Sequence, residues 1–126
     1  EIVITRKNSK EFKNILEIQD TFDPSIKEFA LEHIGDTVSF NGCVGFMMSH
    51  EEYKTRFDVM LKYGDYDNAG EGAQFAFINV TFGDMNVDGA DTVKEGMNFK
   101  ITGTITGYND DGAFIELEPA SMEYRD

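Results

Sequence analysis

The stretch Asp36–Met48, DTVSFNGCVGFMM, decides the fold of this chain. Apolar and polar residues alternate through most of it, and period-two alternation indicates a half-buried strand. Gly42 and Gly45 lie inside the stretch, and glycine within a strand is typical of a bulge or a sharp bend. The side chains expected to face the core are Val38, Phe40, Val44 and Phe46. The sequence therefore predicts one long, bent strand that pairs with two neighbours in a small barrel.

The same residues allow a second interpretation, in which two short strands meet at a hairpin turn. Asn41-Gly42 is a dipeptide typical of such a turn. Too few residues precede Asn41 to make a good partner strand, however, so we favour the single bent strand.

Two amphipathic helices are predicted before this strand. Asn8, with Glu11 three residues later, is typical of a capped helix start. Asp23 as N-cap and Pro24 in the first turn open a second helix, which Gly35 ends. The apolar stripe of the first helix is Phe12, Ile15 and Leu16, and that of the second is Ile26, Phe29, Ala30, His33 and Ile34. Both stripes need a surface to cover, and the strand region supplies it.

Further β-favouring runs follow the bent strand. They are Arg56–Gly64, Gln74–Phe82, Asn98–Tyr108 and Ala113–Glu118, and a short run at Ser121–Tyr124 extends the last one past Pro119. The segment Asn109–Gly112 is a turn that closes a hairpin between the last two strands. The longest connection, Gly83–Gly96, joins the third and fourth strands.

These elements predict a fold that is mainly β with α. Short strands without a parallel βαβ pattern favour a small antiparallel barrel. We expect a five-stranded antiparallel barrel of the oligonucleotide/oligosaccharide-binding (OB) type, preceded by two short amphipathic helices. Residues 1–35 would form a helical extension packed on the barrel, and residues 36–126 the barrel itself. A β-sandwich is the alternative, but it would need about seven strands.

The net charge of −13 narrows the classes of partner. Residues 36–126 hold seventeen Asp and Glu against six Lys and Arg, so the barrel region carries most of the negative charge. Phosphate backbones are bound through Lys and Arg that release counterions, so this composition disfavours nucleic acid. No window of the sequence approaches the ~18 apolar residues of a membrane span.

The sequence contains no catalytic signature. Its single cysteine, Cys43, excludes an intrachain disulfide. His33 falls on the apolar side of the predicted second helix, where a core histidine is expected, and His50 lies in a polar connector. Together these residues lack the spacing of a structural zinc site or of a Cys–His nucleophile pair. We therefore expect no enzyme activity and no cofactor, with calcium as the candidate ion.

The segment Asp84–Glu95, DMNVDGADTVKE, matches the calcium-loop pattern D-x-[DN]-x-[DN]-G-x5-E at its fixed positions. The candidate ligands are the side chains of Asp84, Asn86, Asp88 and Glu95 and the backbone carbonyl of Ala90. Two features oppose a calcium site. Both flanks are predicted as strands rather than helices, and Asp91 occupies the position where an apolar residue normally pairs with a second loop. The alternative is a solvated connection between strands.

Aromatic side chains on the strands could stack on single-stranded nucleic acid, as they do in other barrels. The candidates are Phe57, Tyr63, Tyr66, Phe75 and Phe77. Because many carboxylates and few basic residues surround them, core packing is the better explanation for most of these rings.

Stretches spread over most of the chain resemble a family of bacterial domains of unknown function. They are Asp23–Ala30, Thr37–Gly42, Tyr53–Asp58, Gly64–Tyr66, Gly96–Asn98 and Leu117–Ser121. The family occurs in Firmicutes and Actinobacteria, mostly on exported or membrane-tethered proteins. The resemblance implies an OB-type barrel with a helical extension. It also implies an extracytoplasmic address, with an anchor at the cell envelope upstream of Glu1.

The expected function is that of a non-enzymatic binding or interaction module at the bacterial cell envelope. Its partner would be a protein, a peptide or a glycan that meets the barrel face. Two alternatives are a calcium-dependent module that uses Asp84–Glu95 and a barrel that binds single-stranded nucleic acid. The second alternative rests on analogy of fold, which is weak evidence for function.

Overall fold

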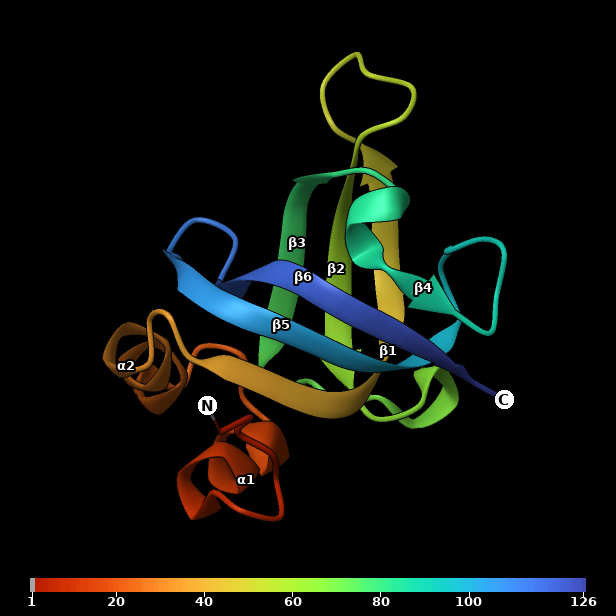
Figure 1. The fold of residues 1–126 in the computed structure, drawn as a ribbon. Coiled ribbons are helices and arrows are strands. Elements are labelled where there is room, and N and C mark those ends of the chain that lie inside the picture. Colours follow the sequence, from red (N-terminus) through yellow and green to blue (C-terminus); the bar gives the residue numbers. More distant parts are fainter. Residues whose placement is uncertain (1) are drawn as a thin grey trace.

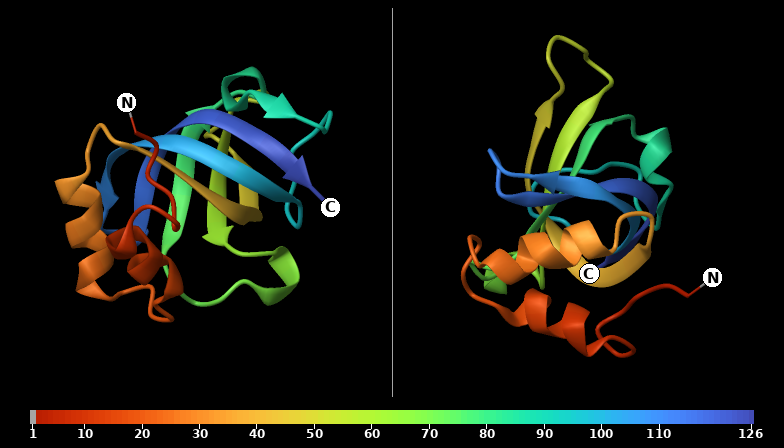
Figure 2. Two further views of the ribbon diagram at one scale, coloured as in Figure 1. Left: turned by 60° about the horizontal axis from the view of Figure 1, so that its bottom comes forward. Right: turned by 90° about the vertical axis from the view of Figure 1, so that its left-hand side faces the viewer.

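The computed structural model describes residues 2–126. Two helices come first, α1 (Lys10–Glu17) and α2 (Pro24–Glu32). The strands are β1 (Thr37–Ser49), β2 (Phe57–Tyr63), β3 (Gln74–Val80), β4 (Val87–Asp88), β5 (Asn98–Asn109) and β6 (Phe114–Arg125), with short 3-10 turns η1 (Tyr66–Asn68) and η2 (Gly83–Met85). The helices lie toward one end of the strand assembly, and the loop between β1 and β2 projects from the opposite end (Figure 1, Figure 2).

Five of the strands close into a barrel, which confirms the predicted class of fold. Their order is β3-β2-β1-β5-β6, and β6 also pairs with β3 to close the sheet. The other four pairs of the ring are antiparallel, as expected, but at this junction Phe75 pairs with Ile115 and Ala76 with Glu116 in parallel register. A ring of five strands cannot alternate in direction all the way round, so one pair has to be parallel. The short strand β4 lies outside the ring, on β6.

The strand β1 is continuous, which confirms the bent-strand prediction and excludes a hairpin at Asn41-Gly42. Its first half pairs with β5 and its second half with β2, and around Gly42 it pairs with both. A Cβ on Gly42 would lie 2.5 Å from the carbonyl oxygen of Lys62. Glycine is therefore required at this position because the two backbones approach closely.

A bulge at Gly45 corrects the prediction for Phe46. The register of β1 against β2 shifts between Val44 and Phe46. One extra residue inverts the alternation of a strand, so the side chains after it change faces. Phe46 is accordingly 50% exposed, and Met47 packs against the core in its place.

The helices form where the sequence predicts them, with one correction at the first cap. Ser9, rather than Asn8, caps α1, since the Oγ of Ser9 accepts the N–H of Phe12 at 3.1 Å. Asp23 caps α2 as predicted and accepts the N–H of Ser25 at 2.9 Å. Each cap satisfies a backbone donor that would otherwise lack a partner inside its helix.

The helices and the inner face of the barrel share one hydrophobic core. The ring of Phe12 on α1 contacts the rings of Phe40 on β1 and Phe75 on β3, with centroids 6.2 and 6.5 Å apart. Because α2 ends at Glu32, His33 and Ile34 leave the helical stripe. His33 is partly exposed rather than a core residue, and Ile34 is exposed.

The last strand extends past Pro119, as predicted, because the runs on either side of Pro119 belong to one strand, β6, which is continuous from Phe114 to Arg125. The connection Gly83–Gly96 contains η2 and β4 and is not structureless. In the part of the chain that the structure describes, no helix is long and apolar enough to cross a membrane.

Candidate binding cleft between β3 and β6

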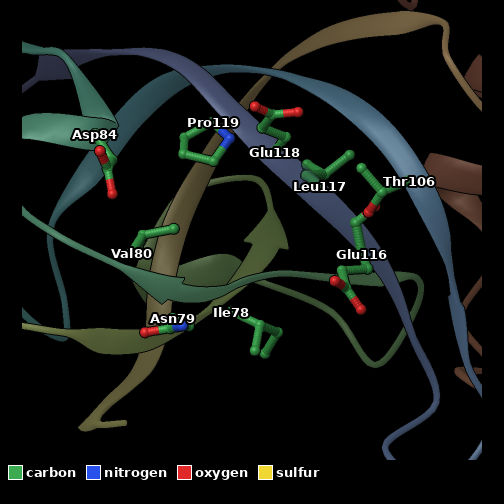
Figure 3. Close-up of a pocket in the computed structure, with 9 residues that line it drawn as sticks. All are labelled: Ile78, Asn79, Val80, Asp84, Thr106, Glu116, Leu117, Glu118 and Pro119. Carbon is green, nitrogen blue, oxygen red and sulfur yellow. The ribbon is translucent and has the colours of Figure 1, made fainter. Parts of the chain in front are cut away.

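A cleft of about 440 Å³ opens where β3 and β6 separate (Figure 3). The two strands pair only through Phe75–Ile115 and Ala76–Glu116. Beyond that point, residues 78–80 of β3 face residues 116–119 of β6 across the cleft. The volume lies within the range of about 300–1,000 Å³ that is common for ligand sites. The edge of β3 at this point is therefore open to a ligand.

Three strand irregularities surround the cleft. The strand β3 has an extra residue opposite Asp58, β5 has one at Thr106, and β6 has one at Ala120. In addition, Pro119 lacks an N–H and cannot donate to a strand on either side. Bulges bend strands and often occur next to functional sites. In this barrel the three bulges lie near the place where β3 and β6 separate, after only two paired positions.

Asn79 is the residue of the β3 bulge with a left-handed backbone, at φ 60°. Asparagine tolerates this conformation better than most residues. Its N–H donates to Oδ1 of Asp58 at 2.9 Å, and Nδ1 of His50 bonds to the same oxygen at 2.8 Å. The guanidinium of Arg56 donates to the Asn79 carbonyl at 3.4 Å. Side chains from β2 and the preceding loop thus hold both backbone polar groups of the bulged residue.

The cleft is lined by three carboxylates, those of Asp84, Glu116 and Glu118. The N–H and hydroxyl of Thr81 lower the pKa of Asp84 below its ordinary value, so this carboxylate is ionised at neutral pH. Within residues 2–126, none of the three forms a salt bridge. The guanidinium of Arg56 lies close enough to act on the charge of Asp84. Three carboxylates against this one cation leave the cleft with net negative charge, which favours a cationic ligand.

A second group of apolar side chains lies on neighbouring positions of β1, β2 and β3, with its exposed members on β1. Phe46 on β1 lies opposite Met60 on β2, and Met60 lies opposite Ala76 on β3. Phe46 and Met48 are 50% and 53% exposed. Exposed aromatic and methionine side chains adapt to varied apolar partners, and such patches are typical of interaction surfaces.

The structure separates the two ends of the predicted calcium loop. The carboxylate of Asp84 accepts the N–H of Thr81 at 2.9 Å, beside the cleft. The carboxylate of Glu95 instead accepts the hydroxyl of Tyr66 at 3.1 Å, near η1. Among the described residues, no three acidic groups of this segment lie close enough to share an ion.

The middle of the same segment is attached to β6. The side-chain amide of Asn86 donates to the carbonyl of Ala120 at 3.2 Å. Asp88 lies in β4, which pairs with β6, and Ala90 packs against the core. Gly89 has a φ of +85°, as the sharp turn of the pattern requires. Calcium binding by this segment stays a prediction, and it would require Asp84 and Glu95 to give up their present partners.

Cys43 lies in the middle of β1 and His50 directly after its end, so the two residues are not brought together. Cys43 is fully buried, and this burial raises the pKa of its thiol. Seven extended residues span about 20 Å, far beyond the reach of a nucleophile–base pair. The two residues therefore do not form a Cys–His catalytic pair in this structure.

Most of the aromatic candidates for stacking belong to the core. Phe75 and Phe77 are fully buried, and Phe57 and Tyr63 are partly buried against the core. Tyr66 is 41% exposed. The expectation that core packing explains most of these rings is confirmed.

A family model described as "Domain of unknown function (DUF4839)" matches residues 7–125. The chain belongs to this family. The DUF4839 match spans both helices, all the strands and the cleft. No curated protein and no solved structure matches the chain.

Sequence reasoning did not find the cleft of this DUF4839 domain. Glu116 and Glu118 look like ordinary outward-facing residues of a strand, and Asn79 like part of a regular run. One signal was available, since Pro119 lies within a strand run and proline in strands is confined to edges and bulges. That rule indicates an interrupted ladder near residue 119.

Proposed function

We propose that this DUF4839 domain is a non-enzymatic binding module whose cleft between β3 and β6 takes an extended peptide with basic side chains. The observation that carries this function is the coincidence of an open β3 edge with three carboxylates, Asp84, Glu116 and Glu118. A peptide strand can bond to an open edge through its backbone and place alternate side chains in a pocket. Lysine or arginine side chains would then meet the carboxylates.

The apolar face beside the cleft supports the same class of ligand. Ile78 and Pro119 contribute apolar surface to the cleft itself. Phe46 and Met48 offer a second apolar contact area on β1, two strands away from β3. A peptide that alternates basic and apolar side chains fits both surfaces, because successive side chains of a strand point to opposite sides.

We assign the barrel to the OB type, on the support of its strand order and its parallel β3–β6 closure. Barrels of that type bind ligands on the face of their second and third strands, beside the cleft. This support is an analogy of fold and does not choose the ligand. The negative charge of the cleft favours a basic peptide over nucleic acid.

The proposed cellular location of the domain is the bacterial cell envelope. Its support is the resemblance of the sequence to domains on exported and membrane-tethered proteins. At that location, the ligand would be an extended basic segment of a surface or secreted protein. No enzyme activity is proposed, since the described residues do not assemble a nucleophile, a base and an orienting group around the cleft.

Peptide titration followed by fluorescence anisotropy tests the proposed function. The probe is a labelled hexapeptide of alternating valine and lysine, and the charge control alternates valine and glutamate. We expect the lysine peptide alone to bind. Replacing Glu116 and Glu118 together with Gln should weaken binding about fivefold to tenfold, because two exposed charge contacts are lost.

A matched variant and two further ligands complete this experiment. Glu123→Gln removes one charge from the same strand outside the cleft and should bind the lysine peptide like the wild type. Equal binding of both peptides, or unchanged binding by the double variant, would overturn the assignment of the cleft. Binding only to a thymidine oligonucleotide would favour the nucleic-acid alternative, and binding only to an oligosaccharide would favour a glycan.

A further inference from the structure

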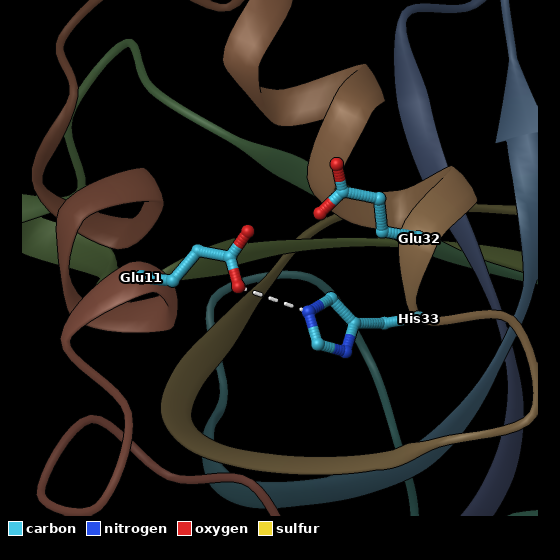
Figure 4. A group of neighbouring side chains, drawn as sticks. All are labelled: Glu11, Glu32 and His33. Atoms are coloured by element: carbon cyan, nitrogen blue, oxygen red, sulfur yellow. Dashed lines mark hydrogen bonds and ion pairs between the residues drawn. The ribbon is translucent and has the colours of Figure 1, made fainter.

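A second cluster of chemically active side chains lies where the helices meet, away from the cleft. Glu11 projects from α1, and Glu32 and His33 lie at the end of α2 (Figure 4). One ligand atom from each residue lies within 4.8 Å of the other two. Nε2 of His33 is 3.0 Å from Oε1 of Glu11.

The ring of His33 is held in a fixed orientation. Nδ1 lies 2.9 Å from Oδ2 of Asp36, and the ring packs on Phe29 with centroids 4.3 Å apart. A carboxylate on one ring nitrogen orients the other nitrogen, as in many metal-bound histidines. Here Asp36 directs Nε2 toward Glu11 and Glu32. Nε2 of His33 lies 3.0 Å from Oε1 of Glu11. An unprotonated nitrogen would repel the carboxylate oxygen at this distance, so a proton or a metal ion has to lie between the two atoms.

The surroundings of Nε2 of His33 favour a positive charge at this position. Within the described residues, no Lys or Arg forms a salt bridge with Glu11, Glu32 or Asp36. The C-terminal end of α2 adds the negative pole of a helix.

We propose that Glu11, Glu32 and His33 bind a divalent first-row metal ion, with Zn²⁺ as the best fit. Imidazole and carboxylate are both common zinc ligands, and zinc bonds of ~2.1 Å place tetrahedral ligands about 3.4 Å apart. The three ligand atoms now lie within 4.8 Å of one another, so small rotations of the two exposed glutamate side chains bring them to this spacing. The remaining coordination position would hold water. A bound ion would cross-link α1 to the end of α2, where the chain enters β1.

His50 provides an internal comparison for this site. Its Nδ1 is bonded to Asp58 at 2.8 Å, and its Nε2 lies 3.3 Å from one carboxylate, that of Glu51. His33 has two carboxylates on its Nε2 side, whereas His50 has one. The spacing of histidines in the sequence gives no sign of the His33 site, because its ligands come from separate helices.

Metal titration of the full chain tests this site. Zinc is added to the EDTA-treated protein, and the melting temperature Tm and the ring signals of His33 and His50 in NMR spectra are recorded. We expect zinc to raise Tm and to shift the His33 ring, with little change at His50. Glu32→Gln should weaken zinc binding about tenfold or more, because it removes a charged ligand. Glu28→Gln, an exposed change of the same charge on α2, should leave it unchanged.

Three outcomes would overturn the zinc site. The first is a wild-type Tm and His33 spectrum that zinc does not change. The second is an equal zinc response in the wild type and Glu32→Gln, which would place the ion elsewhere. The third is a zinc-dependent shift at His50 alone. Because Glu32 makes no hydrogen bond to His33, Glu32→Gln leaves the proton-bridged contact with Glu11 intact and tests the metal specifically.

Discussion

The carboxylate of Asp58 accepts a hydrogen bond from the backbone N–H of Asn79 at 2.9 Å. Asn79 is the left-handed residue of the β3 bulge, and it lines the cleft between β3 and β6. Asp58 lies on the neighbouring strand, with its side chain 22% exposed, and also bonds to His50. The shape of the β3 edge therefore depends on a side chain that does not line the cleft.

Replacing Asp58 with alanine should lower the free energy of unfolding by about 1–3 kcal/mol. The substitution removes a charged acceptor from one backbone N–H and one imidazole. Asp58→Asn retains an acceptor oxygen and should lower the free energy of unfolding by less than Asp58→Ala does. Urea denaturation measures both values, and equal losses in the two variants would argue against the bond to Asn79 as the cause.

Replacing Gly42 with valine should destabilise the protein by about 1–3 kcal/mol, because the added side chain has no space. Its Cβ would lie 2.5 Å from the Lys62 carbonyl oxygen and 2.9 Å from a methyl group of Ile101. Gly107→Ala is the control, since no atom lies within 4 Å of its Cβ. Thermal melts that show the same Tm for Gly42→Val and the wild type would contradict the close approach of β1 and β2.

The bent strand and both helices could be predicted because local patterns specify them. Alternation around Gly42 predicted β1, and Asp23-Pro24 predicted the start of α2. The outward position of Phe46 could not be predicted from alternation, because one bulge residue inverts it. The parallel closure of β3 on β6 joins residues about forty positions apart, and no local pattern encodes that pairing.

The cap of α2 should make stability depend on acidic pH. The bonds from the hydroxyl and N–H of Ser25 lower the pKa of Asp23 below its ordinary value of 3.8. A lowered folded-state pKa contributes stability above the unfolded-state pKa, and this contribution is lost as pH falls through the folded-state pKa. Asp23→Ala should therefore melt below the wild type at neutral pH, and the gap should narrow in acid.

Asp111→Ala is the matched control for the cap. Asp111 is exposed in the turn between β5 and β6. Its substitution should leave Tm close to that of the wild type at each pH. A gap between Asp23→Ala and the wild type that stays constant through the acid range would exclude the Asp23 charge as its source.

Millimolar calcium should not raise Tm more than magnesium does. The bonds of Asp84 to Thr81 and of Glu95 to Tyr66 hold the two ends of the predicted loop in different places. Bringing them to one ion would break these contacts and detach Asn86 from β6. A calcium-selective rise in Tm that Glu95→Gln abolishes would show that the segment rearranges into a calcium site.

The candidate cleft was harder to predict than the fold, for a physical reason. Its carboxylates come from η2 and β6, which lie far apart in the sequence and meet only after the barrel closes. The sequence motif with the best pattern match, Asp84–Glu95, contributes only Asp84 to the cleft. Spacing along the sequence predicts a site when all of its residues lie in one loop, and the carboxylates of the cleft do not lie in one loop.

Mapping the valine–lysine peptide by NMR is the most direct measurement of the cleft as a binding site. In two-dimensional amide spectra of the whole chain, we expect the largest shifts at residues 78–80 and 116–118, on both sides of the cleft. Shifts confined to the loop between β1 and β2, to the helices, or spread evenly over the acidic surface would contradict the proposed site.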